Sequence, residues 1–172
     1  MEANAEKRQA FQKLTESIPE ELLVYIDESG IEEGACKEHG WSKIGEVIPA
    51  QRSGKTYQRL NIIAAQNGRK ALAPFTFYGS CNTDIFNLWV EKVLLPELKP
   101  GQVVILDNAT FHKSKKTKEL IERAGCQLLF LPPYSPDLNP IEKFWAKMKK
   151  WIRNQWTNFL DLYASLQTFF DI

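Results

Sequence analysis

Short apolar runs alternate along this chain with longer stretches whose apolar residues recur at a helical spacing. The apolar runs are bounded by Gly, Pro and Asn, which predicts strands that end in turns. These runs occupy residues 21–30, 41–49, 56–68, 71–79, 101–109 and 127–133. The runs that precede residue 80 follow one another at hairpin-like spacing, so an antiparallel meander is expected there.

The helical stretches have recognisable start and stop signals. They lie at residues 5–17, 83–95, 114–125 and from 140 onward. Thr83 and Ser114 are the predicted caps of the two middle helices, and Gly125 is expected to close the second of them. In the last helix, apolar residues fall within an arc of roughly 120°, which is typical of a helix that packs on a core. They are Ile141, Phe144, Trp145, Met148, Trp151 and Ile152.

The order of elements predicts the fold class. Three strands come first and are followed by helix, strand, helix, strand and helix. Strands separated by helices imply right-handed crossovers and parallel neighbours. We therefore expect an α/β domain with a mixed five-stranded sheet, an antiparallel meander followed by parallel strands, flanked by helices.

Two of the predicted strands end in aspartate. VYIDE closes on Asp27 and VVILDN closes on Asp107. Each alone is more often a turn former than a ligand. If the two strands are parallel neighbours, however, the two carboxylates lie close together at one edge of the sheet, where ligands of open α/β sheets bind.

A third carboxylate follows the extended stretch PPYSPDLNP (132–140). Asn139 is a good N-cap, Pro140 suits the first helical position, and Glu142 is placed to reach back to the cap amide. Glu142 also falls about 60° beyond the apolar arc, at the core boundary, so it can lie beside the aspartates. Capping and a functional role are compatible, because a helix N-terminus keeps a carboxylate ionised.

Three crowded carboxylates require a cation. At ~4 Å each like-charge pair costs ~4 kcal/mol with an effective dielectric near 20. Oxygen ligands favour Mg²⁺ or Mn²⁺, and two such ions stabilise the attacking and leaving oxygens of a phosphoryl transfer. Cys36 and His39 are spaced like half a zinc site, but no second pair accompanies them, so we expect reduced thiols rather than zinc.

Composition and charge narrow the class of protein. Apolar residues make up 44% and charged residues 25% of the 172, which is typical of a globular domain rather than a disordered chain. No apolar run approaches the ~20 residues of a membrane span, so a soluble, cytoplasmic protein is expected. The net charge of +1 conceals two basic stretches, 113–118 and 143–153, which suit a polyanion or a solvated helix face equally well. RSGKT (52–56) lacks the first glycine of a P-loop, so nucleotide binding is rejected there.

Three motifs together resemble a known family. YIDESG (25–30), VILDNATFH (104–112) and LPPYSPDLNPIEKFW (131–145), in this order, resemble the catalytic domain of mariner-superfamily Asp-Asp-Glu transposases. The bacterial insertion-sequence 630 family is the group they resemble most. The resemblance covers roughly residues 20–160, which leaves 1–19 as a lead-in helix and 161–172 as a helical tail, possibly truncated.

The resemblance implies a ribonuclease H-like fold in which Asp27, Asp107 and Glu142 are catalytic and bind two Mg²⁺, with Mn²⁺ as a substitute. Such enzymes cut DNA at transposon ends and transfer the 3′-hydroxyl into target DNA, at TA sites in mariner-type elements. His112 matches the family's histidine, with a hydrogen bond to a carboxylate or phosphate, or a structural role, as its expected function. Asn108 and Asn139 are expected to orient the carboxylates. The candidate contacts to DNA phosphates are Lys113, Lys115, Lys116, Lys147, Lys149 and Lys150.

The resemblance also sets the expected partners. These are double-stranded DNA, a second copy of the chain, and a helix-turn-helix region from a separate chain or a frameshift fusion, in a nucleoid-associated protein. Two alternatives stay open: a stand-alone nuclease with the same fold, and an inactive transposon remnant that binds DNA or an intact transposase.

Overall fold

The computed structural model describes residues 5–32, 59–155 and 161–171 of the chain. Within them, five strands form one mixed sheet in the order β3-β2-β1-β4-β5. The strands are β1 (Leu23–Glu32), β2 (Arg59–Asn67), β3 (Lys70–Tyr78), β4 (Val103–Leu106) and β5 (Gln127–Phe130). Pairing is antiparallel from β1 to β3 and parallel from β1 through β4 to β5, so the predicted mixed sheet is confirmed. The strand predicted at 41–49 lies outside the described residues.

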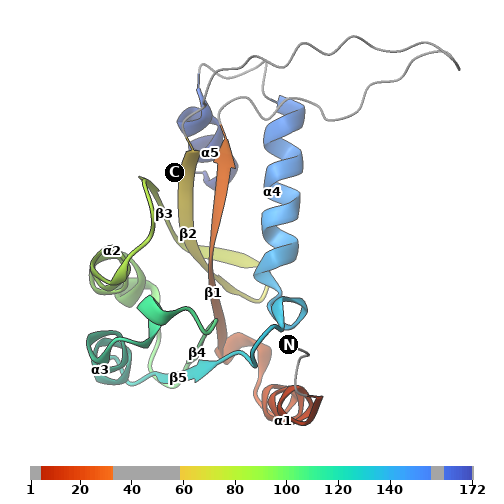
Figure 1. Cartoon of the computed structure of the whole chain (residues 1–172), viewed down its shortest axis with the longest axis vertical. Helices are drawn as coiled ribbons and strands as arrows, with labels where there is room; N and C mark the ends of the chain where they lie inside the picture. Colours follow the sequence, from red (N-terminus) through yellow and green to blue (C-terminus); the bar gives the residue numbers. More distant parts are fainter. Residues whose placement is uncertain (1–4, 33–58, 156–160, 172) are drawn as a thin grey trace, which may run out of the picture.

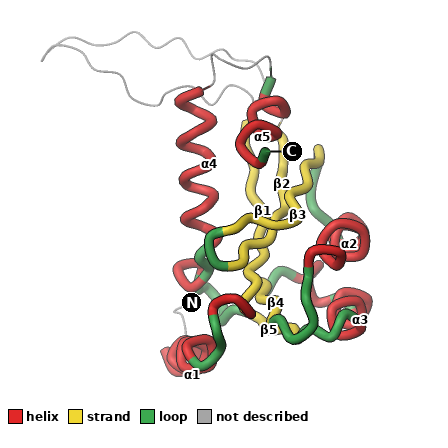
Figure 2. The backbone as a smooth tube through the Cα atoms, turned by 180° about the vertical axis from the view of Figure 1, so that it is seen from behind, coloured by secondary structure: helices red, strands yellow, loops and turns green. Residues whose placement is uncertain are grey.

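Helices cover both faces of the sheet. They are α1 (Ala5–Glu16), α2 (Thr83–Trp89), α3 (Lys115–Arg123), α4 (Ile141–Gln155) and α5 (Leu162–Phe170). Figures 1 and 2, seen from opposite sides, place α2 and α3 on one face and α1 and α4 on the other. Among the described residues, no helix is both long and apolar enough to cross a membrane.

The ends of α2 and α3 follow the expected chemistry with one exception. Ser114 caps α3 by accepting the Thr117 N–H at 3.0 Å, and Gly125 after this helix has φ 74°. The predicted cap at Thr83 is wrong, because Asn82 caps α2 through the Ile85 N–H at 2.9 Å. Asn82 is extended, and its carboxamide reaches the third helical residue, so Thr83 becomes the first residue of the helix.

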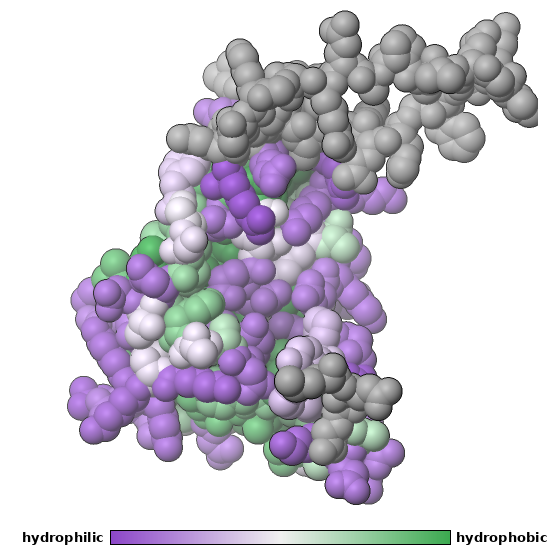
Figure 3. All heavy atoms as spheres, viewed as in Figure 1, coloured by the Kyte–Doolittle hydropathy of each residue, from purple (hydrophilic) through white to green (hydrophobic). Residues whose placement is uncertain are grey.

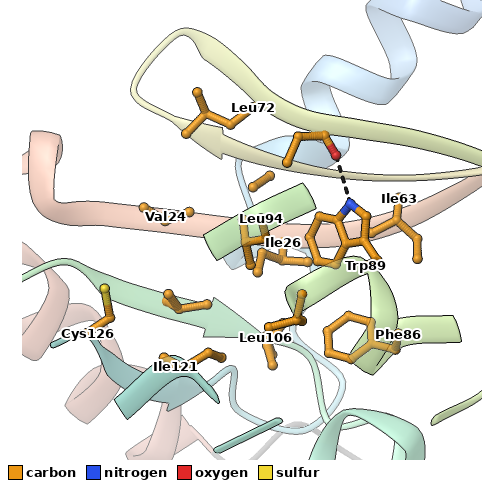
Figure 4. Packing of buried hydrophobic residues seen from close by; sticks show 14 residues of the cluster. Val24, Ile26, Ile63, Leu72, Phe86, Trp89, Leu94, Leu106, Ile121 and Cys126 are labelled. Carbon is orange, nitrogen blue, oxygen red and sulfur yellow. Dashed lines mark hydrogen bonds between the residues drawn. The ribbon is translucent and has the colours of Figure 1, made fainter. Parts of the chain in front are cut away.

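The core on the α2 side is organised around Trp89. Its ring contacts Phe86 at a centroid distance of 5.6 Å, and Figure 4 shows it among Ile26 and Ile63 of the sheet. The Trp89 ring N–H donates to the Ala73 carbonyl at 2.8 Å. Ala73 has φ 52°, an unusual value for a residue with a side chain, at the register irregularity between β2 and β3. This hydrogen bond therefore holds a strained part of the sheet against a helix.

The core on the opposite face joins α4 and α5 to β1 and β2. The α4 residues Ile141, Trp145, Met148 and Ile152 are all at most 2% exposed. They pack against sheet residues such as Ile62, which confirms the predicted apolar arc. This packing fixes how the first turn of α4 lies over β1.

Replacing Trp89 with Phe should destabilise the fold by about 1–3 kcal/mol, because the buried Ala73 carbonyl loses its donor. The free energy of unfolding from urea denaturation is the measurement. Leu88→Ala on the exposed side of the same helix is the control and should change it by less than about 0.5 kcal/mol. A Trp89→Phe variant as stable as its parent would contradict this role of the hydrogen bond.

Candidate active site

Strand pairing places Asp27 and Asp107 next to each other. The last parallel pair between β1 and β4 is Tyr25 with Ile105, and each aspartate comes two residues later on its strand. Asp107 follows the end of β4, as predicted, but Asp27 does not end β1. That strand continues to Glu32 because it stays paired with β2 beyond the point where β4 stops. The two carboxylates are thus adjacent, although only one of them ends a strand.

Glu142 joins the aspartates from the first turn of α4. A pocket of about 230 Å³ is lined by all three carboxylates. Its other lining residues are Asn108, Ala109, Leu131, Pro132, Tyr134, Ser135, Pro136 and Asn139. The structure therefore brings together, from β1, the end of β4 and α4, the three acidic residues singled out in the sequence.

The predicted capping role of Asn139 and Glu142 is wrong. The Asn139 carbonyl accepts the Glu142 N–H at 3.2 Å, but its side-chain Oδ1 is buried without a hydrogen-bond partner among the described residues. The Asn139 N–H donates to Pro136 instead of to the Glu142 carboxylate. The reason is the short helical turn over Pro136–Leu138, which satisfies this amide before α4 begins. The Glu142 carboxylate is consequently free for the pocket.

The surroundings of Asp27 disfavour its ionised form. Burial raises its pKa to about 7, and the negative charges of Glu28 and Glu142 act in the same direction. The Trp145 ring N–H donates to Asp27 Oδ2 at 3.1 Å and opposes the rise. Trp145 was predicted only as a core residue. It belongs to both the α4 core and the pocket, because its ring is buried while its nitrogen reaches the strand.

Asp107 has the opposite electrostatic environment. Burial alone would raise its pKa, but hydrogen bonds from His112 and the Ala109 N–H, with the charges of His112 and Lys113, lower it. His112 Nδ1 lies 2.5 Å from Asp107 Oδ1, and His112 Nε2 lies 2.8 Å from Glu28 Oε1.

His112 is fully buried between these two carboxylates. Burial favours its neutral form, yet the hydrogen bonds to Asp107 and Glu28 raise its pKa to about 9. A ring with both nitrogens protonated donates to both carboxylates. The expected hydrogen bond from His112 to a carboxylate is present, and Glu28 is a partner that the sequence motifs did not reveal.

The asparagines and the loop before α4 form the wall of the pocket. The Asn108 side chain donates to the Leu131 carbonyl and so joins the end of β4 to the chain after β5. Among the described residues, neither Asn108 nor Asn139 donates to the three carboxylates, so the action of Asn108 on them is indirect. Tyr134 has φ 54°, a strained value of the kind that accumulates at functional sites.

The predicted DNA-contacting lysines divide into two groups, apart from Lys149. In the first, Lys115 and Lys116 pair with acidic residues at 3.6 and 3.2 Å, and Lys113 lies 5.8 Å from the centre of the Phe130 ring. In the second, Lys147 and Lys150 are exposed on α4 and form no ion pair within the described residues. Lys149 is half-buried and lines a hollow beside Arg59 and Arg153.

The cysteine predictions are only partly covered by the structure. Cys81 and Cys126 are free thiols, as expected. Cys36, His39 and the RSGKT stretch at 52–56 lie outside the described residues.

The residues of the pocket fit a divalent cation chemically. Their donors are carboxylate oxygens. Burial and the neighbouring negative charges raise the pKa of Asp27, and a bound cation offsets both effects by stabilising the ionised form. The described part of the chain contains no group of three or more acidic, His or Cys side chains already gathered for metal binding.

The sequence model of the family described as DDE superfamily endonuclease matches residues 22–162. The chain belongs to the DDE superfamily endonuclease family. Two relatives share short segments with it: a Tcb2 transposase from Caenorhabditis briggsae, 45% identical over 47 residues, and an uncharacterized protein, y4pE/y4sA, from Sinorhizobium fredii, 43% identical over 54 residues. These segments cover 27% and 31% of this chain, and 17% and 38% of the respective relatives.

Solved structures share the fold of this DDE domain. The Mos1 strand transfer complex aligns with a TM-score of 0.75 at 16% identity, over 99% of this chain and 55% of that one. The catalytic domain of Mos1 mariner transposase aligns with a TM-score of 0.62 at 15% identity, over 99% of this chain and 82% of that one. The predicted ribonuclease H-like fold is confirmed. The chain spans about half the length of the Mos1 transposase in its DNA-end complexes.

The two aspartates should affect stability in opposite directions. Asp27 has a folded-state pKa of about 7 against an ordinary 3.8, so its ionised form opposes folding increasingly as pH rises from about 4 to about 7. Asp27→Asn should therefore stabilise the metal-free domain at pH 8, by at most about 4 kcal/mol at about 1.4 kcal/mol per pH unit, with a smaller gain at pH 5.

Asp107 has a lowered pKa, so its ionised form stabilises the fold above the ordinary value and this contribution is lost as pH falls through the folded pKa. Asp107→Asn should therefore destabilise at pH 8. Urea denaturation in a chelator at both pH values measures the two effects. Loss of stability at pH 8 in Asp27→Asn would show that this carboxylate is not strained.

Proposed function

We propose that this chain is the catalytic domain of a transposase that cleaves DNA strands at transposon ends and transfers the freed 3′-hydroxyl into target DNA. The observation that supports this most strongly is that Asp27, Asp107 and Glu142 line one pocket in a DDE-family domain. The family model gives the type of enzyme, and one named relative, Tcb2, and the Mos1 structural neighbours are transposases.

The proposed reaction has two steps. Water first attacks a phosphodiester at the transposon end, which breaks the bond to the 3′-oxygen and leaves a 3′-hydroxyl and a 5′-phosphate. The 3′-hydroxyl then attacks a phosphodiester of the target, so that one new bond replaces one broken bond without a covalent protein intermediate.

The carboxylates act as holders of divalent cations in this proposal. Asp27, Asp107 and Glu142 would hold two Mg²⁺, for which Mn²⁺ substitutes, and the ions supply charge stabilisation to the attacking and leaving oxygens. Trp145 orients Asp27, and His112 orients Asp107, through the hydrogen bonds described above. Asn139, buried at the pocket with its Oδ1 unpartnered among the described residues, is placed to contact the bound group.

Exposed lysines of α4 are proposed to contact the DNA backbone. Lys147 and Lys150 are about one turn apart on the helix that carries Glu142 in its first turn, so a strand held at the pocket can continue along α4. Hydrophilic residues are widespread among the coloured atoms of Figure 3, with apolar areas between them. The lysines at 113–116 are weaker candidates, because acidic or aromatic neighbours already engage them.

Two features are proposed by analogy with mariner elements. Insertion at TA dinucleotides is tested by sequencing transfer junctions, and random junctions would reject it. A dimer, expected because two ends must be joined together, is tested by sedimentation of the DNA-bound chain, and a strictly monomeric complex would reject it. Membership of the insertion-sequence 630 group is part of the same proposal.

The decisive assay combines plasmid nicking with strand transfer of a labelled duplex that carries a free 3′-hydroxyl. Asp27→Asn, Asp107→Asn and Glu142→Gln should each lower both Mg²⁺-dependent activities by about a thousandfold, because losing one cation-holding group removes several kcal/mol of charge stabilisation. Asp84→Asn, an exposed acid on α2, is the matched control and should retain activity.

The outcomes separate the candidate functions. Nicking without strand transfer would indicate a stand-alone nuclease, and a folded chain inactive with both Mg²⁺ and Mn²⁺ would indicate a transposon remnant. Full activity of Glu142→Gln would remove Glu142 from the site.

Neutralising both Lys147 and Lys150 should weaken DNA binding and lower the slope of log K against log salt by about 2, because each phosphate contact contributes about 0.9. The slope is measured by fluorescence anisotropy at salt concentrations from roughly 50 to roughly 200 mM. The control replaces Lys92 and Lys118, whose charges are paired with Glu91 and Glu122. Equal slopes for the two double variants would contradict the proposed path along α4.

A further inference from the structure

Within residues 5–32, 59–155 and 161–171, Glu28 is the acidic residue that is hydrogen-bonded to His112 from the opposite face of the sheet. It follows Asp27 in β1, and successive strand residues point to opposite faces. Its side chain is 19% exposed, and its Oε1 lies 2.8 Å from His112 Nε2. Glu28 is absent from the residues that line the pocket of the three carboxylates. Its hydrogen-bond connection to the site therefore runs through His112.

The neighbours of His112 restrict the rotation of its ring. Phe86 and Phe111 each lie with their ring centroids 4.3 Å from that of His112, at interplanar angles of 52° and 64°. These apolar rings form walls but offer no hydrogen-bond acceptor. The ring is fully buried, so water does not replace a lost partner freely. Within the described residues, the Glu28 carboxylate is thus the group that fixes ring rotation on the side away from Asp107.

The other side of the ring determines how Asp107 is held. Asp107 Oδ1 accepts both from His112 Nδ1 and from the Ala109 N–H, the latter at 2.8 Å. Among the described residues, Asp107 Oδ2 has no hydrogen-bond partner. Two donors on one oxygen set the plane of the carboxylate, and the second oxygen stays available to the pocket that Asp107 lines.

We propose that Glu28 is a positioning residue that fixes Asp107 through His112, so that the free Asp107 oxygen is presented to a divalent cation. This inference rests on the proposed function of the pocket. The relay resembles the general arrangement in which a partner of a ligand's hydrogen-bonding group sets the ligand's orientation, and loss of such a partner costs about 10–100-fold in metal affinity.

Variants that change either the length or the charge of the residue at position 28 distinguish a positioning role from a purely electrostatic one. Glu28→Gln keeps an acceptor oxygen at the same reach but loses the charge. Glu28→Asp keeps the charge but is one methylene shorter. Glu28→Ala loses both. Glu32→Ala, at the exposed end of β1 and on the same face, is the matched control.

The first readout is Mn²⁺ affinity from calorimetric titration. Glu28→Ala and Glu28→Asp should each weaken Mn²⁺ binding by about tenfold or more. Glu28→Gln and Glu32→Ala should bind like the parent chain. Parental affinity in Glu28→Asp, or equal weakening in Glu28→Gln and Glu28→Asp, would overturn the proposal. Glu28→Asp decides if Glu28→Ala does not fold.

The second readout is the His112 Nδ1–H resonance in the ¹H–¹⁵N spectrum of the metal-free chain. It should be sharp in the parent and in Glu28→Gln, and broadened or absent in Glu28→Asp. An unchanged resonance in Glu28→Asp would overturn the relay even without any metal. A parent chain that binds no Mn²⁺ but shows the expected spectra would contradict the proposed function while leaving the relay from Glu28 to Asp107 in place.

Discussion

Burial of a carboxylate beside two other acidic residues is the constraint on which the site of this domain depends. Asp27, Glu28 and Glu142 come from adjacent strand residues and a helix N-terminus, and burial, reinforced by the charges of Glu28 and Glu142, raises the pKa of Asp27. Such a grouping persists only when the surrounding packing over-determines it. Hydrophobic clusters on the two faces of the sheet meet this requirement, since α4 packs over β1 on one face and α2 packs on the other.

The fold handles its two aspartates differently, although they are neighbours. Asp107 receives a histidine and a backbone N–H on one oxygen, whereas Asp27 has the Trp145 N–H and two acidic neighbours. The surroundings therefore stabilise the ionised form of Asp107 and destabilise the ionised form of Asp27. A site that must accept a cation benefits from this inequality, because the strained group gains most when positive charge arrives.

Patterns along the chain carried enough information for the sheet and for the three acidic residues, because strand alternation, helix periodicity and the motif around Pro140 are local signals. The contacts that orient those residues could not be predicted as readily from the sequence. Glu28 is bonded to His112 across 84 positions of the chain, and Trp145 to Asp27 across 118. Trp145 also satisfies the apolar periodicity of α4, so its polar function was hidden by its role in the core.

The local preferences of single residues gave wrong predictions where the tertiary structure supplied a competing hydrogen-bond partner. Asn139 is a residue type that is favoured at N-cap positions. The short helical turn before it accepts its backbone N–H, however, and its side chain lies at the pocket. Asp27 looked like the end of a strand because Asp, Ser and Gly follow the apolar run closely. Pairing with β2 carries the backbone through those residues, and this long-range hydrogen bonding outweighs their turn preference.

The order in which the three carboxylates occur along the chain has a consequence for biosynthesis. Asp27 is made early, Asp107 follows after the meander and α2, and Glu142 arrives only with α4. A nascent chain emerging from the ribosome therefore has two of the three groups while its last helix is still missing. The complete acidic set first exists when α4 docks on β1, which is also when the core on that face closes. Trp145 lies in that core and donates to Asp27, so the full acidic set and the closed core of this face depend on the same packing of α4.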